Sequence, residues 1–174
     1  MEQSLDRIFL EFSRKKLLQL SERITDCCLG RLSAEQVWAR GSENENAVGN
    51  LVLHLCGNVR QWIIASVGGQ PDIRVRDREF TARGDVEPAE LAERLKATVE
   101  EAAVVIDSVT AARLAEHVVI QKYDVTVLEA IAHVVEHFGQ HTGQIMFVTK
   151  MLTGKDLGYY GHLKTTAAHA EKTP

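Results

Sequence analysis

The chain has 174 residues, of which 45% are apolar and 25% are charged, a composition typical of globular domains and incompatible with wholesale disorder. The formal net charge of −4 leaves no basic excess to hold a nucleic acid, and three cysteines do not make a disulfide framework. Residues 1–7 lack the apolar core of a signal peptide, and the longest uncharged stretch, 47–59, is too short to span a bilayer. We therefore expect one cytoplasmic domain over residues 1–174, with neither nucleic acid nor membrane as a partner.

The N-terminal third of the chain begins with a helical period. Ser4 is a suitable N-cap, and the apolar stripe that follows it predicts a helix to about Leu29. Ser33 and Gln36 have the spacing of a capping box, which predicts a short second helix over residues 33–39.

A longer helix is predicted over residues 47–67, where apolar residues occur almost all round and indicate a buried element. The next segment, 72–87, is dense in charge, and we expect an ordered but irregular crossing. Its arginines either bind an anionic ligand or form a solvated, ion-paired surface, and the second interpretation is preferred. These arginines are Arg74, Arg76, Arg78 and Arg83.

The last two long helices lie in the second half of the chain. Pro88 is a good first-turn residue and opens an amphipathic helix that runs to about Val109. A connection follows, with a short extended piece expected at 118–120. The final helix is predicted from about Val125 to Leu152.

Helices of this number and length predict an all-α fold, a four-helix bundle. Its core is expected over about residues 4–153, with a C-terminal tail over 154–174. The two tryptophans, Trp38 and Trp62, are expected in the core or an interface. The thiol of Cys56 is expected to be buried and inert.

Histidines on the last predicted helix give the strongest chemical signal. His133, His137 and His141 follow one another at a spacing of four, so they project from one helix face. Two imidazoles so placed can bind one metal ion when another element supplies a third ligand, and His54 in the buried helix is the candidate. Imidazoles suit Zn, Ni, Fe or Cu. The alternative is that these histidines only make hydrogen bonds in the bundle.

Polar neighbours of the histidines suggest further roles. Asn58 lies one turn after His54, and Gln144 lies close to the last histidine of the row, so either amide could hold the second ring nitrogen of a ligand. Both could equally satisfy other polar groups of the bundle. Glu136 and His133 are the candidate acid/base residues of a reaction.

The segment from His137 to Gln144 resembles the signature of the DinB/YfiT-like superfamily of metal-dependent enzymes. That signature is a histidine, three residues, and then His-x-Gly-Gln, which His137, His141, Gly143 and Gln144 match. The residues around His54 resemble the second-helix half of the same site. Thr142 stands where many relatives have arginine.

The resemblance covers about residues 4–153 and implies an up-down-down-up bundle that forms a homodimer. It also implies a divalent transition metal, Zn or Ni, held by His54, His137 and His141. Relatives include transferases and isomerases that use low-molecular-weight thiols such as mycothiol or bacillithiol. A small-molecule substrate and such a thiol are therefore implied here.

Two functions follow from these residues. The first is a metal-dependent enzyme, either a thiol-dependent S-transferase or a hydrolase, in which three protein ligands leave coordination positions open. The second is a non-catalytic binding or scaffold bundle with structural or vestigial histidines, which the lack of an unambiguous acid/base residue favours.

Overall fold

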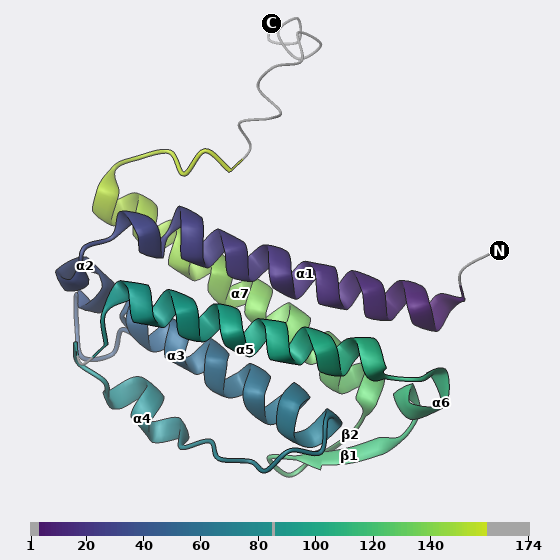
Figure 1. Ribbon diagram of the computed structural model, residues 1–174. Helices are drawn as coiled ribbons and strands as arrows, with labels where there is room; N and C mark the ends of the chain where they lie inside the picture. The colour runs from purple at the N-terminus through teal and green to yellow at the C-terminus, as the bar shows by residue number, and fades with distance from the viewer. Residues whose placement is uncertain (1–3, 85, 160–174) are drawn as a thin grey trace, which may run out of the picture.

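Four long helices make up the computed structural model, which describes residues 4–84 and 86–159 (Figure 1). They are α1 (Leu5–Cys27), α3 (Val48–Val59), α5 (Pro88–Ser108) and α7 (Val127–Thr153). Figure 1 shows that α1 and α7 run in one direction and that α3 and α5 run in the opposite direction. The predicted all-α four-helix bundle is confirmed, and its helices have the up-down-down-up order.

Each long helix packs against two others, since α1 and α3 both contact α5 and α7. The apolar stripes that the sequence predicted line the space between them, and the largest fully buried side chain is Phe138 on α7. Burying one such side chain contributes about 1.5–3 kcal/mol. Other fully buried side chains are Leu10, Leu17, Ile24, Leu55, Ile63, Leu91, Leu95, Ile106, Ile131 and Ile145.

Short elements connect the long helices. They are η1 (Leu29–Arg31), α2 (Ala34–Trp38), α4 (Arg76–Thr81), α6 (Ala111–Leu114), and the strands β1 (His117–Ile120) and β2 (Tyr123–Thr126). The expected irregular crossing thus contains a helix, α4. The expected connection contains α6 and an antiparallel hairpin, in which Ile120 pairs with Tyr123.

The hairpin corrects the predicted start of the last helix. Gln121 and Lys122 form its two-residue turn, with φ of 53° and 82°, the positive values that tight hairpins require. Val125 therefore lies in β2. Thr126 is the N-cap of α7, and its hydroxyl oxygen accepts a hydrogen bond from the backbone N–H of Glu129.

The helix predicted over 47–67 changes its winding half-way. From Arg60 to Val67 it continues as the π-helical segment η2, in which the backbone N–H of Gly68 donates to the carbonyl of Ile63 over 2.8 Å. This wider turn is common beside functional sites. Trp62, in the first turn of η2, is buried, as expected.

Helix ends follow the predicted signals. The capping box of Ser33 and Gln36 is present at α2, and Gly154 ends α7 with a φ of 63°, a value that glycine adopts without strain. Ser4 is the N-cap residue of α1, although its side chain makes no capping hydrogen bond.

The core extends beyond its predicted limit at residue 153. Leu157 is buried, and the guanidinium of Arg31 donates to the carbonyls of Asp156 and Leu157 over 3.1 and 3.0 Å. The first part of the predicted tail therefore packs on the bundle. Among the described residues, none of the helices has the length and apolar character needed to cross a membrane.

Candidate metal centre

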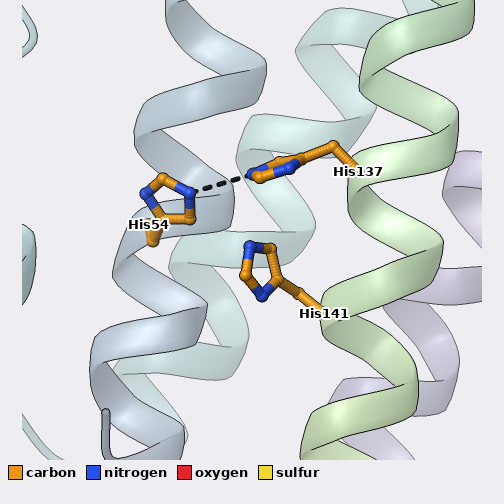
Figure 2. A group of neighbouring side chains, drawn as sticks. All are labelled: His54, His137 and His141. Atoms are coloured by element: carbon orange, nitrogen blue, oxygen red, sulfur yellow. Dashed lines mark hydrogen bonds between the residues drawn. The ribbon is translucent and has the colours of Figure 1, made fainter. Parts of the chain in front are cut away.

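Three histidines from two helices face one another inside the bundle (Figure 2). His54 comes from α3, and His137 and His141 come from α7. One ring nitrogen of each lies within 4.8 Å of the other two, so the group could hold a metal ion. The Nε2 atoms of His54 and His137 are 2.9 Å apart.

These spacings fit a metal ion after small movements of the rings. Imidazole nitrogens bound at about 2.0–2.1 Å in a tetrahedral site lie about 3.3 Å from one another. The Nε2 atoms of His54 and His137 are closer together than this distance. The limit of 4.8 Å within which all three ring nitrogens lie is larger than this distance. The ring nitrogens therefore need to move by only a few tenths of an ångström to about an ångström. Rotation about the side-chain torsions permits movements of this size.

The helix faces explain the convergence. Residues four apart on α7 share a face, and the adjacent face is anchored by Phe138 and Thr142, both buried. His54 lies on the nearly fully buried α3, and only 7% of its surface is exposed. The site is therefore built on packed helices rather than on loops.

A carboxylate on α4 sets the orientation of His54. Nδ1 of His54 lies 2.9 Å from Oε2 of Glu79. Arg74 holds that carboxylate, since its Nε donates to Oε1 over 2.7 Å and its Nη2 donates to Oε2 over 2.8 Å. Burial raises the pKa of Glu79, but the hydrogen bonds from Arg74 and His54 outweigh it and lower the pKa below its ordinary value.

The charge of Glu79 decides the tautomer of His54. An ionised carboxylate only accepts hydrogen bonds, so Nδ1–H of His54 donates to Glu79. Nε2 then keeps its lone pair and faces His137 (Figure 2). A carboxylate behind a histidine is the usual outer partner of a metal-binding imidazole.

Gly57 makes room for this arrangement on α3. A Cβ atom at this position would overlap Oε1 of Glu79 and lie 2.9 Å from Nε of Arg74. The side chain of Arg74 is only 3% exposed, and its Nη1 also donates to Oε1 of Gln61 over 2.9 Å. The Arg74–Glu79 pair thus packs directly against the helix that carries His54.

The two amides that the sequence suggested have different surroundings. Oε1 of Gln144 lies 2.7 Å from Nδ1 of His141, so Nδ1–H donates and Nε2 is left with a lone pair. At Nδ1 of His54 the structure places Glu79, not Asn58. Asn58 is buried, and its Oδ1 has no hydrogen-bond partner within residues 4–84 and 86–159.

The environment keeps His137 and His141 neutral at pH 7. Burial, together with the neighbouring His141 and His54, lowers the pKa of His137 to about 4. Burial also lowers the pKa of His141, against the opposing effect of the hydrogen bond that its Nδ1–H donates to Gln144. A neutral ring is the form that binds metal ions.

A cavity of about 430 Å³ adjoins His54 and His137, and His133 also lines it. The ring of His133 packs on Trp62, with 4.2 Å between the ring centroids, and burial lowers its pKa. Glu136 is exposed and accepts a hydrogen bond from Gln140 over 3.3 Å. Of the two acid/base candidates, the structure brings His133 to the cavity.

The arginines of the crossing have separate roles. Arg74 is in the buried pair, and Arg83 donates to the carbonyls of Phe80 and Ala82. The guanidinium of Arg76 lies over the ring of Phe80, 4.8 Å from its centroid, and lines the cavity beside the histidines. Arg74 is ion-paired, as the preferred interpretation expected, but the expected solvation is wrong because the pair is buried.

Sequence reasoning missed Glu79 as a partner of the histidines. It lies in a charge-dense segment without periodicity, so nothing in the pattern separates it from exposed acids such as Asp77. One signal was available: Gly57 lies inside a helix, almost one turn after His54, and a glycine there indicates close approach of another segment.

Comparisons with known proteins agree with this fold. A family model described as protein of unknown function (DUF1572) matches residues 4–161. A solved structure, the crystal structure of a conserved protein from Enterococcus faecalis, is similar with a TM-score of 0.68 and 16% sequence identity, covering 83% of this chain and 97% of that chain. At this identity the likeness shows the fold alone. The curated proteins give no match.

Proposed function

The chain belongs to the DUF1572 family, whose function is unknown, and we propose that it is a metal-dependent enzyme of the DinB/YfiT-like type. In this proposal His54, His137 and His141 bind Zn or Ni. The observation that carries it is the convergence of three ring nitrogens from two helices within 4.8 Å. Chance histidines on one helix would not meet a third that is buried on another.

The partners of the rings support metal binding over a purely structural role. Glu79 and Gln144 each accept a hydrogen bond from Nδ1–H of a ring, so two of the three rings present Nε2 toward the centre. A divalent ion with three imidazole ligands supplies a Lewis acid with an open position. The adjoining cavity is the side from which a small molecule reaches that position.

Residues of this chain give the cavity its chemistry. The rings of Trp62 and Tyr123, whose centroids are 6.5 Å apart, offer an apolar wall for the body of a substrate. His133 is the proposed acid/base residue, because its lowered pKa leaves it neutral and able to accept a proton at pH 7.

We propose thiol transfer to a small electrophile as the reaction, with hydrolysis as the alternative. The support is the resemblance of the His137–Gln144 segment to thiol-using relatives. The test measures loss of free thiol when Zn- or Ni-loaded protein is given bacillithiol or mycothiol and a chlorodinitrobenzene electrophile. We expect catalysed loss in the wild type and in His117→Ala, an exposed control on β1, and none in His141→Ala.

A non-catalytic binding bundle is the second candidate, and one observation favours it. Glu129 on α7 is an acidic residue that lines the cavity. Its carboxylate already accepts hydrogen bonds from the backbone N–H and the hydroxyl of Thr126, so it is not free to act as a catalytic base. A loaded protein that binds metal and turns over neither thiols nor esters would establish this candidate and overturn the enzyme proposal.

We also propose a homodimer located in the cytoplasm. The exposed apolar side chains Leu5, Ile8 and Phe12 on α1 support an interface between copies. Light scattering coupled to gel filtration tests the dimer, and a mass of one chain would contradict it.

A further inference from the structure

A second cavity also has the Arg74–Glu79 pair in its wall. It has a volume of about 350 Å³ and is lined by residues of α3, α5 and the segment around α4. Four of its lining residues are arginines, Arg60, Arg74, Arg78 and Arg94, and one is the acid Glu79. This concentration of cations stands out in a chain whose net charge is −4.

Two of the four guanidiniums already have partners. The guanidinium N–H groups of Arg74 donate hydrogen bonds to the carboxylate of Glu79 and to Oε1 of Gln61. Arg60 donates to Oε2 of Glu101 over 2.7 Å. The carboxylate of Glu79 is itself fully engaged by Arg74 and His54, so it does not neutralise the other cations.

The other two guanidiniums are available to a ligand. Within the described part of the chain, the side chains of Arg78 and Arg94 form neither an ion pair nor a hydrogen bond, and both are exposed. One comes from α4 and the other from α5, so they approach the cavity from two different elements.

The rest of the wall adds no negative charge. Cys56 and Thr98 are the uncharged polar side chains of the wall. Leu53, Ile73 and Val75 complete the wall with apolar surface.

We propose that this cavity binds the phosphate group of a small molecule, with Arg78 and Arg94 as its principal contacts. Guanidinium groups present paired N–H donors that match phosphate oxygens, and such charge-assisted bonds are strong. The volume is at the small end of ligand sites, which range over about 300–1,000 Å³. A phosphate monoester with a small apolar body fits both the cations and the apolar wall.

The test titrates metal-free protein with inorganic phosphate and with phenyl phosphate by calorimetry. We expect saturable binding to the wild type, tighter for phenyl phosphate. Arg78→Gln and Arg94→Gln should each weaken it about tenfold, because each removes a charge-assisted contact. Arg83→Gln is the matched control, since this arginine bonds backbone carbonyls outside the cavity and its loss should leave binding unchanged.

NMR spectra of the arginine Nε–H groups show where the phosphate binds, because the signals of the contacting arginines move during the titration. Signals assigned to Arg78 and Arg94 should move on titration, and that of Arg83 should not. Absence of saturable binding, or retention of it in the Arg78→Gln/Arg94→Gln double variant, would overturn the proposal. Loss of binding in Arg76→Gln alone would place the anion beside the histidines and would also overturn it. Since no metal is present, neither result depends on the proposed enzyme function.

Discussion

Nδ1 of His54 lies 2.9 Å from Oε2 of Glu79, so a residue of α4 fixes the ring of a histidine on α3. The carboxylate holds the proton on Nδ1 and leaves Nε2 facing His137. Orientation of this kind reduces the freedom that a ligand loses when it binds metal. The short helix α4 is therefore part of the candidate metal centre and not only a connection.

Replacing Glu79 by glutamine tests this role. The amide keeps the size of the side chain but lacks the charge that fixes the tautomer of His54. We expect the affinity for Zn to fall about 10–100-fold, the usual effect of losing an outer carboxylate. Competition with a chromogenic chelator measures it. Asp77→Asn, an exposed acid on the same helix, is the control and should keep the wild-type affinity. Equal affinities in all three proteins would contradict the role of Glu79.

Gly57→Ala tests the close approach between α3 and the Arg74–Glu79 pair. The added methyl group would overlap Oε1 of Glu79, so the buried pair must move, and a cost of about 3 kcal/mol in the free energy of unfolding is expected. Urea unfolding measures it. Gly143→Ala on α7 is the matched control, since among the described residues no atom lies within 4 Å of its Cβ position apart from those of its chain neighbours and the backbone of its own helix. It should stabilise the protein by up to about 1 kcal/mol, as alanine favours helix. A neutral Gly57→Ala would show that the pair does not pack there.

The lowered pKa of His137 predicts how stability depends on pH in the metal-free protein. Its ring titrates at about 4 in the folded chain and near 6.5 when unfolded. Between these values the unfolded chain binds the proton and the folded chain does not, so stability falls as pH falls from 6.5 to 4. Urea unfolding at several pH values measures this slope. His137→Gln should reduce it, and an unchanged slope in the variant would contradict the assignment.

Phe138 and Phe147 separate the core face of α7 from its exposed face. Phe138 is fully buried, and Phe147 is 65% exposed. Truncation of Phe138 to alanine should cost about 3–5 kcal/mol in the free energy of unfolding because it leaves a cavity. Phe147→Ala should stay within about 0.5 kcal/mol of the wild type. Thermal or urea unfolding of both variants tests whether Phe138 lies on the core face of α7 and Phe147 on its exposed face. Similar losses of unfolding free energy in the two variants would refute this.

Local patterns in the sequence predicted the long helices well. The apolar spacing, the capping box at Ser33 and the stop at Gly154 are each decided by neighbours within a few residues, so they can be read from the chain. The extended piece predicted at 118–120 lies in β1, but its pairing with β2 and the π-helical turn at Arg60 were missed, because local signals there are weak and packing decides the structure.

The candidate site was predictable only in part. The repeat of four on α7 and a histidine inside an apolar helix pointed to the residues that the structure brings together. The partner of His54 comes from 25 residues further along the chain, and a contact at that separation leaves no periodic trace. Only the bundle topology shows that the segment holding Glu79 passes beside α3.

Metal content is the most direct measurement of the central claim. Elemental analysis of untagged protein, reloaded with Zn or Ni and then freed of unbound metal, should give about one ion per chain for the wild type. His54→Ala should lose that ion, and His117→Ala should keep it, with circular dichroism showing that both variants fold. Wild-type protein that binds no metal after reloading, or a His54→Ala variant that binds as much as the wild type, would contradict a metal centre shared by α3 and α7.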